Sequence, residues 1–366
     1  MVYPLLVHAV ALGERGIKVR MFDAEMPGYG DCDLLVVDSK YFSGPVRGQL
    51  AFVQDALGRM GRSVPLAWYD TTDSAGWLVS GVFPLVRRYF KNQMLRDVRA
   101  YTRPLYGRRA YTDFYHRSVG VVDKEPEQNA AIDDVRLLDR LRLGWNSGLA
   151  DYSRWGPLRT RLYARTRISA LLARDRSGTP ADRRRTMPMS CRMGLHYARD
   201  TVAYQRRQIA QRLKVESGKL GRGAYFSELR NSRLVISAFG LGEITLKDFE
   251  VFLTGGLLVK PDMSHLATWP DLYRTSETIA TFSWDLSDLE AVIDQHLSAP
   301  DRAVEIAAAG QAVYLKHVSG DEASRLFADR FASLVQDTLA DLVPADRTAP
   351  EPAASANNLA AAGTGL

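Results

Sequence analysis

A short apolar run, DLLVVDS at residues 33–39, most strongly limits what this chain can fold into. Its near-continuous hydrophobicity is typical of a strand buried on both faces of a parallel sheet. A helical pattern follows at about 47–60, and VPLAWYD predicts another strand at 64–70. This strand–helix–strand order favours a doubly wound α/β unit. Upstream, we predict a helix over residues 3–14 and a strand over 17–22. A Rossmann-like unit opens with a strand before its first helix, and no such strand precedes the helix predicted at 3–14.

The length of the chain predicts more than one domain. It has 366 residues, and domains usually contain about 100–200. The polar stretch 171–190 has the composition of a linker between an N-terminal domain at 1–170 and a C-terminal domain at 191–343. The Ala/Pro-rich tail at 344–366 is expected to be disordered.

The composition favours a soluble protein in a reducing compartment. The chain shows neither the run of about 18 apolar residues that a membrane span needs nor a signal-peptide pattern. Its two cysteines, Cys32 and Cys191, cannot form a disulfide framework or a zinc site by themselves. We therefore expect a cytoplasmic protein.

Positive charge is concentrated in one segment of the chain. The net charge is +6, and residues 87–117 carry nine Lys or Arg against two Asp. Such an excess is found on solvated basic faces, and also where proteins bind nucleic acid, an anionic membrane or a phosphorylated small molecule.

The stretch FGLGEITLKDFEVFLTGGLLVKP, residues 239–261, contains several features of a binding site. Thr245 and Asp248 predict a capping box at the start of a helix, and Gly255 predicts its end. A glycine-rich turn before a helix N-terminus can hold a phosphate. Glu250 lies among apolar neighbours, where a carboxylate is costly unless it is paired or bound. Asp248 is explained by the helix dipole alone.

Extended to residue 273, as FGLGEITLKDFEVFLTGGLLVKPDMSHLATWPDLY, the stretch resembles the nucleotide-sugar-binding half of GT-B glycosyltransferases with family-1-like C-terminal domains. AAAGQAVYLKHVS at 307–319 is similar to the closing segment of that family and places His317 in its pattern. YFKNQMLRD and RPLYGRRAYTDFYH resemble the N-terminal half more weakly. The resemblance implies two Rossmann-like domains facing a cleft, the N-terminal one lacking a recognisable first strand.

The resemblance also implies roles for particular residues. Glu250 matches the carboxylate that binds the nucleotide ribose, and Gly240 and Gly242 match the turn that admits the donor phosphates. Glu243 resembles the first member of the paired-Glu motif of retaining enzymes, although the two glutamates are one position too close. Further cations proposed for donor binding are Lys260, which could equally be a surface lysine with its charge in water, and Arg192.

An inverting mechanism would need a general base in the first domain. The candidates are Asp70, Asp73, Asp113 and His116. The alternative for each aspartate is a helix or turn cap, and for His116 a half-buried structural role.

The favoured function is a glycosyltransferase that moves a sugar from a nucleotide-sugar donor to a glycan or lipid-linked acceptor. We expect no metal, because no DxD-like acidic cluster stands out, and we expect peripheral contact with an anionic membrane. One alternative is a nucleic-acid-binding α/β protein whose 87–117 aromatic side chains stack on bases. Another is a degenerate glycosyltransferase fold that only binds. A hydride-transfer enzyme is disfavoured, because no G-x-G-x-x-G follows a strand.

Overall fold

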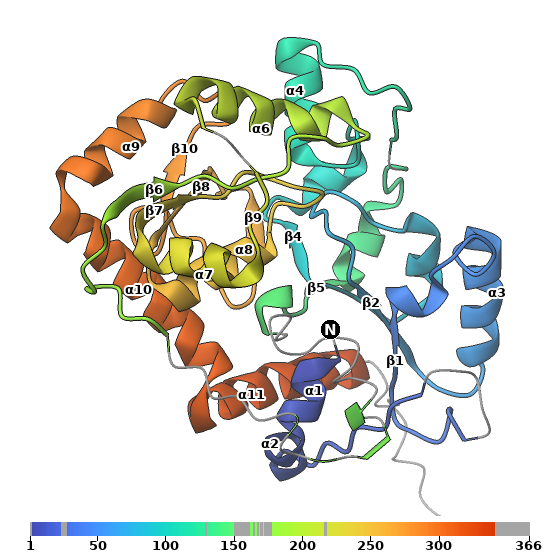
Figure 1. The fold of residues 1–366 in the computed structure, drawn as a ribbon. Helices are drawn as coiled ribbons and strands as arrows, with labels where there is room; N and C mark the ends of the chain where they lie inside the picture. The colour runs from blue at the N-terminus through green and yellow to red at the C-terminus, as the bar shows by residue number, and fades with distance from the viewer. Residues whose placement is uncertain are drawn as a thin grey trace, which may run out of the picture.

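The computed structural model describes residues 2–22, 28–128, 130–149, 162–163, 165–166, 168, 171, 178–215 and 218–340. These residues form two four-stranded parallel sheets with helices packed around them (Figure 1). The expected α/β class with two Rossmann-like units is confirmed.

The first sheet has its strands in chain order and all parallel. They are β1 (Leu35–Asp38), β2 (Leu66–Asp70), β3 (Arg88–Lys91) and β5 (Leu141–Leu143). Helix α3 (Leu50–Met60) connects β1 to β2. Every residue of β2 is buried, as its apolar sequence predicts for a central strand of a parallel sheet.

The second sheet has the order β10-β8-β7-β6, also parallel. Its strands are β6 (Met187–Ser190), β7 (Ser232–Ile236), β8 (Leu257–Pro261) and β10 (Ala280–Phe282). The helices of this unit are α6 (Asp200–Leu213), α7 (Arg222–Asn231), α8 (Leu246–Thr254), α9 (Leu289–Ser298) and α10 (Pro300–Val318).

The predicted strand at 17–22 is wrong: those residues form no strand. Ile17 and Val19 pack against the core, which accounts for the alternating pattern without a strand partner. β1 is therefore the first strand in the described part of the chain and an outer strand of its sheet. The predicted helix at 3–14 is divided at His8 into α1 (Tyr3–Val7) and α2 (Ala9–Glu14).

The linker predicted at 171–190 contains β6, which pairs with β7 in the second sheet. Its last four residues are thus part of the C-terminal unit. Residues 172–177, and the tail predicted at 344–366, lie outside the described residues.

The last helix, α11 (Gly320–Leu339), returns to the first unit and packs beside α2 (Figure 1). The rings of Phe327 and Phe331 meet Trp145 edge-on, with centroids 5.4 and 5.8 Å away. The Asp337 carboxylate accepts hydrogen bonds from Arg88 at 2.7 Å and Arg142 at 2.9 Å. The C-terminal end of the second unit is thereby fixed to the first sheet.

A two-stranded antiparallel ribbon also joins the units. It pairs β4 (Gln93–Leu95), which follows β3, with β9 (Leu266–Thr268), which follows β8. Nearby, the Asn146 amide donates to Thr268 Oγ1 at 2.9 Å. The segments beyond the carboxyl ends of the two sheets therefore meet.

Replacing Asp337 with Asn should destabilise the protein by about 1 kcal/mol at neutral pH, a modest value because the carboxylate side chain is 35% exposed. Burial would raise the pKa of Asp337, but hydrogen bonds from Arg88 and Arg142 hold it below its ordinary value. The carboxylate's contribution to the free energy of unfolding is therefore complete above the ordinary aspartate pKa of about 4. It is lost as the pH falls through the lower pKa that Asp337 has in the folded protein.

Urea unfolding of wild type and Asp337→Asn at pH 7 and pH 3 measures this difference. Asp329→Asn is the matched control, because Asp329 is on the same helix but its pair with Arg15 is more exposed. If the two variants lost the same free energy of unfolding at pH 7, the stabilising role given to the Asp337 carboxylate would be contradicted.

Candidate active site between the two sheets

Where the two units meet, several buried polar atoms have no hydrogen-bond partner among the described residues. They are Asn92 Oδ1, Gln93 Oε1, Glu243 Oε1 and both ring nitrogens of His265. Asn92 and Gln93 follow β3, Glu243 follows β7 and His265 follows β8. Burying a polar group without a partner costs about 1–3 kcal/mol. Such groups in one region indicate that something else satisfies them.

Glu243 is completely buried at this interface. Its Oε2 accepts a hydrogen bond from the backbone N–H of Ala75, in the first unit, at 3.0 Å. Its Oε1 has no partner. The carboxylate is thus fixed by one oxygen, and the other has no hydrogen-bond partner among the described residues.

Gly242 makes the close approach of the two units possible. A Cβ atom at this position would overlap the carbonyl group of Asp73. Gly242 was predicted to admit donor phosphate. In the structure, its missing side chain admits the backbone of the other unit, and the phosphate role stays a prediction.

His265 has an aromatic environment. Its ring meets Trp284 edge-on with the centroids 4.8 Å apart, and Phe239 lies 6.3 Å away. Burial lowers the pKa of His265, although the Glu243 and Asp262 charges oppose this. The ring is therefore neutral at pH 7 and offers one donor and one acceptor.

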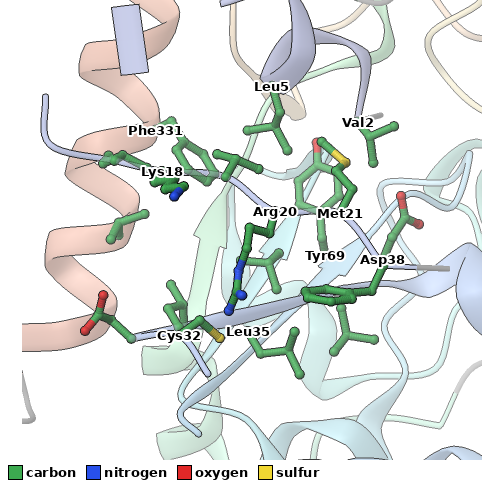
Figure 2. A pocket seen from close by; sticks show the side chains of 18 of the residues that line it. Val2, Leu5, Lys18, Arg20, Met21, Cys32, Leu35, Asp38, Tyr69 and Phe331 are labelled. Atoms are coloured by element: carbon green, nitrogen blue, oxygen red, sulfur yellow. The ribbon is translucent and has the colours of Figure 1, made fainter. Parts of the chain in front are cut away.

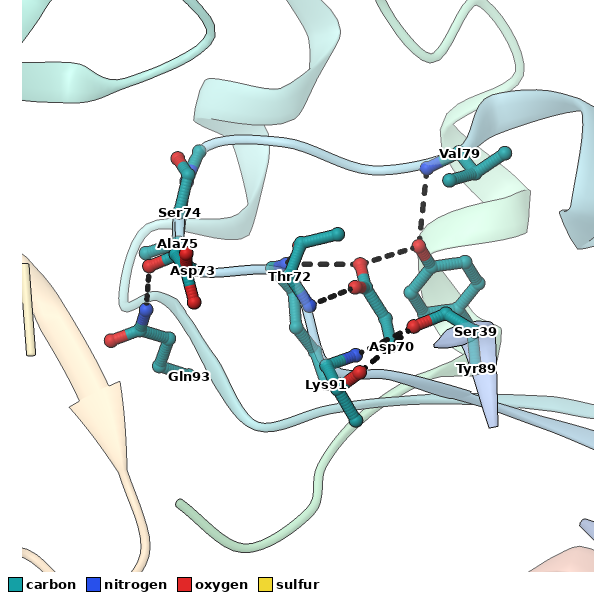
Figure 3. Close-up of polar contacts among 12 residues, drawn as sticks. Ser39, Asp70, Thr72, Asp73, Ser74, Ala75, Val79, Tyr89, Lys91 and Gln93 are labelled. Carbon is teal, nitrogen blue, oxygen red and sulfur yellow. Dashed lines mark hydrogen bonds and ion pairs between the residues drawn. The ribbon is translucent and has the colours of Figure 1, made fainter. Parts of the chain in front are cut away.

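Asp70 is at the centre of a buried network at the end of β2 (Figure 3). Its carboxylate pairs with Lys91 Nζ at 3.0 Å and accepts hydrogen bonds from the Tyr89 hydroxyl at 2.7 Å and the Thr72 N–H at 2.8 Å. Both Asp70 and Lys91 have no exposed side-chain surface. The network orders the turn that carries Asp73, and the role of Asp70 as a base stays a prediction.

Asp73 is the base candidate that borders the interface. It lines a cavity of about 40 Å³ together with Asn92, Gln93 and Ser147. Its backbone carbonyl accepts a hydrogen bond from the Gln93 amide (Figure 3). The residue is exposed, so its carboxylate is accessible as well as close to the buried polar groups.

The other two base candidates, Asp113 and His116, both lie in α4 (Ala110–Val119). Asp113 accepts a hydrogen bond from the Tyr106 N–H at 3.0 Å and pairs with Arg117 at 2.9 Å. His116 Nδ1 is 2.9 Å from the carbonyl oxygen of Val121, and its ring stacks on Tyr106. These contacts are local to the first unit, and a catalytic role for either residue stays a prediction.

The loop at 239–242 is held through its carbonyl groups. Arg206 donates to Phe239 O, the Tyr111 hydroxyl to Gly240 O, and Arg109 Nε to Leu241 O at 2.6 Å. A Cβ at Gly240 would lie 3.1 Å from Arg206 Nη2, so glycine permits this contact.

Within the described residues, the N–H groups of Leu241, Gly242 and Glu243 donate no hydrogen bond. They lie just before the N-terminus of α8, where N–H groups and the helix dipole favour anions. This segment could therefore receive the phosphates of a ligand.

The helix signals of the motif are confirmed. The capping box between Thr245 and Asp248 is present, and Gly255 ends α8 with φ +71°. Asp248 does more than cap the helix, however. It is fully buried, pairs with Lys260 Nζ at 2.9 Å and accepts hydrogen bonds from Ser237 and Tyr273. The Lys260 ammonium thus has a partner inside the protein, and neutralisation of a donor phosphate by it stays a prediction.

Glu250 lies against α7. Its Oε2 accepts a hydrogen bond from the Tyr225 hydroxyl at 2.8 Å. Burial raises the pKa of Glu250, and the hydrogen bond from Tyr225 opposes this. The apolar neighbours in the sequence therefore do not leave this carboxylate unpaired, and its role in ribose binding stays a prediction.

Arg192 follows β6, and Lys247 is in the first turn of α8. Arg192 forms a two-pronged pair with the Glu228 carboxylate, at 2.9–3.1 Å. Lys247 Nζ donates to the carbonyl oxygen of Arg192, and burial lowers the pKa of Lys247 to about 8. Donor binding by Arg192 also stays a prediction.

His317, which the resemblance included, has its Nδ1 2.8 Å from the carbonyl oxygen of Val313 on α10. Its ring meets Trp269 edge-on, with the centroids 5.5 Å apart.

The aromatic side chains predicted as base-stacking platforms are mostly in the core. Side chains with at most 1% exposure are Tyr89, Phe90, Tyr101, Tyr111 and Tyr115. They cannot stack on nucleic acid without unfolding. Of the basic residues in the segment, Lys91 pairs with Asp70, Arg88 pairs with Asp337, and Arg109 holds backbone carbonyls. The structure thus removes most of the aromatic stacking platforms on which the nucleic-acid alternative depended.

In the described parts of the chain, no group of three or more His, Cys, Asp or Glu side chains could hold a metal ion. Metal independence stays a prediction. No described helix has the length and apolar character needed to cross a bilayer.

No protein-family model matches this sequence, and no curated protein does either. Among solved structures, Anabaena HepE in complex with UDP is similar over 86% of this chain and 80% of its own, with 11% identity and a TM-score of 0.42. A glycosyltransferase from Rickettsia africae covers 92% and 82%, with 9% identity and a TM-score of 0.39. A UDP-forming trehalose-phosphate synthase from Burkholderia xenovorans covers 93% and 78%, with 14% identity and a TM-score of 0.34.

The sequence predictions missed His265, Asn92 and Gln93. Each directly follows a strand or the turn after it, which is where open α/β sheets bind ligands. Their position just after a strand could have identified these residues as candidates for ligand binding. Arg109 and Arg206, which hold the glycine-rich loop, carried no signal, because their contacts join segments far apart in the sequence.

Replacing Gly242 with Ala should destabilise the protein by about 3 kcal/mol or prevent folding, because the added methyl group overlaps the rigid Asp73 backbone. Gly240→Ala is the matched control, since its methyl group meets only the flexible end of Arg206. Urea unfolding should show a clearly smaller loss for the control. A Gly242→Ala variant as stable as Gly240→Ala would show that the two units do not meet in this way.

Proposed function

We propose that the protein is a glycosyltransferase that moves a sugar from a nucleotide-sugar donor to a glycan or lipid-linked acceptor. One observation carries the proposal. Where the two Rossmann-like units meet, the described residues leave one oxygen of the buried Glu243 carboxylate and both ring nitrogens of the neutral His265 without a hydrogen-bond partner.

The unpaired atoms suit a polyhydroxylated ligand. The free oxygens of Asn92, Gln93 and Glu243 are acceptors and need donors. Neutral His265 supplies one donor and one acceptor. Sugar hydroxyls both donate and accept, so they can satisfy these acceptors and His265 together. The transferred sugar would therefore bind between the units.

The leaving group requires a different environment. Departure of a nucleoside diphosphate develops negative charge, which oriented N–H groups and a helix N-terminus stabilise. The N–H groups at 241–243 and the start of α8 meet this need beside the sugar site. Glu250 and Arg192 remain our candidates for binding the nucleoside.

Asp73 is the first base to test if the reaction inverts configuration, because its exposed carboxylate borders the interface cavity. We further propose that no metal is required and that the reaction contributes to polysaccharide synthesis at the cytoplasmic side of a membrane. The exposed Arg96, Arg99, Arg103 and Arg117 support contact with anionic lipid there.

A thermal-shift series with UDP, GDP, CMP and dTDP tests donor binding in the wild type. One nucleotide should raise the melting temperature, because it binds only the folded state. Glu250→Gln should weaken its binding about tenfold through loss of a charged acceptor. Glu243→Gln should leave it within threefold of wild type.

The same two variants separate binding from chemistry. Hydrolysis of the matching nucleotide-sugar, followed as release of the nucleoside diphosphate, should fall about 100-fold or more in Glu243→Gln, because the neutral amide no longer stabilises positive charge on the oxocarbenium-like sugar. A folded wild type that binds none of the four nucleotides would overturn the proposed function. Nucleotide binding without turnover of any donor would favour the degenerate, binding-only fold.

A further inference from the structure

A cavity of about 420 Å³ lies in the first unit, apart from the interface site. Figure 2 shows Leu5 from α1, Leu35 from β1 and Phe331 from α11 around it. Small-molecule sites in proteins usually have about 300–1,000 Å³. The cavity is thus large enough for a ligand that nothing above accounts for.

The walls of this cavity are mainly apolar. Ile17, Val19 and Leu35 line it and pack against the core while remaining only partly buried. Apolar surface left facing water is unfavourable, and covering it stabilises the complex in proportion to its area. The walls therefore favour a hydrocarbon occupant.

The cavity exists because residues 17–22 do not pair with β1. The cavity is lined by both segments, and β1 pairs only with β2 among the described strands. Arg20 instead donates to the carbonyl oxygens of Gly28 and Asp31. A sequence with the alternation of a strand thus forms one wall of an open slot along the sheet edge.

The slot and the small interface cavity are lined by residues that are neighbours in sequence. Asp38 and Tyr41 line the slot, whereas Lys40 between them lines the small interface cavity. Ser39 Oγ lies 3.0 Å from Thr71 Oγ1, and Thr71 also borders the interface cavity. A chain lying along β1 would therefore present its polar end beside Asp73 and the unpaired groups.

The slot is lined by two positively and two negatively charged side chains, so its net charge is zero. Lys18 and Arg20 line it together with Asp33 and Asp38. This balance favours a neutral head group over an anionic one.

We propose that the slot binds the hydrocarbon chain of an amphipathic acceptor whose neutral sugar head group reaches the interface site. The role as acceptor depends on the proposed function. The binding of the chain does not.

Isothermal titration with hexyl, octyl and decyl β-D-glucoside, each below its micelle concentration, tests the binding. Burying one methylene gives about 0.8 kcal/mol, which corresponds to a fourfold gain in affinity. Each step of two methylenes should therefore tighten binding about 15-fold, and methyl β-D-glucoside should bind too weakly to measure. Affinity that is independent of chain length would overturn the proposal.

Variants that fill the slot with a larger side chain test whether the alkyl chain binds there. Val19→Trp should weaken octyl glucoside binding at least tenfold, whereas Val122→Trp, at an exposed position of the same unit, should not. Leu5→Phe fills the slot from the α1 side and should act in the same direction if Val19→Trp does not fold. Wild-type affinity in a folded slot-filling variant would contradict the proposal.

Two readouts distinguish this proposal from the proposed function. A nucleotide thermal shift without chain-length-dependent glucoside binding would overturn the slot proposal alone. Chain-length-dependent binding without any nucleotide shift would support the slot and overturn the acceptor role. With an active donor, the kcat/KM for transfer to alkyl glucosides should rise from hexyl to decyl, and a flat series would refute the acceptor role.

Discussion

The contact between Gly242 and the backbone of Asp73 sets the geometry on which the rest of the site depends. It brings the carboxyl ends of two parallel sheets to van der Waals distance, because no side chain intervenes. The Ala75 N–H can then bind the Glu243 carboxylate across the boundary. Loop carbonyls held by Arg109, and the β4–β9 ribbon, keep the units in this relation.

This approach leaves polar groups buried but only partly satisfied. Two buried ion pairs, Asp70–Lys91 and Asp248–Lys260, are complete within their own units and order the turns beside the interface. By contrast, Glu243 and His265 are incomplete. A polyhydroxylated ligand would supply the missing partners of these groups.

Local signals predicted much of the fold, and long-range contacts decided the rest. The apolar run at 33–39 and the Thr245 capping box depend on neighbours in sequence, and both the strand and the capping box form. The expected burial of that strand on both faces was wrong, because β1 is an outer strand in which only Val37 is buried. The strand expected at 17–22 does not form, because pairing depends on a partner that local alternation cannot reveal. Asp248 looked like a simple cap, and only the fold brings Lys260 to it. His265 had no motif, since its meaning comes from the residues of other segments around it.

Hydrogen–deuterium exchange with and without a panel of UDP-glucose, GDP-mannose and dTDP-glucose tests the central claim most directly. Exchange of backbone amides slows where a ligand binds them or stops the surrounding segment from opening. The account predicts that one donor protects residues 240–245 together with 92–95 and 265–268, from both units. Protection confined to one unit, or to segments away from these loops, would contradict a donor site between the two sheets.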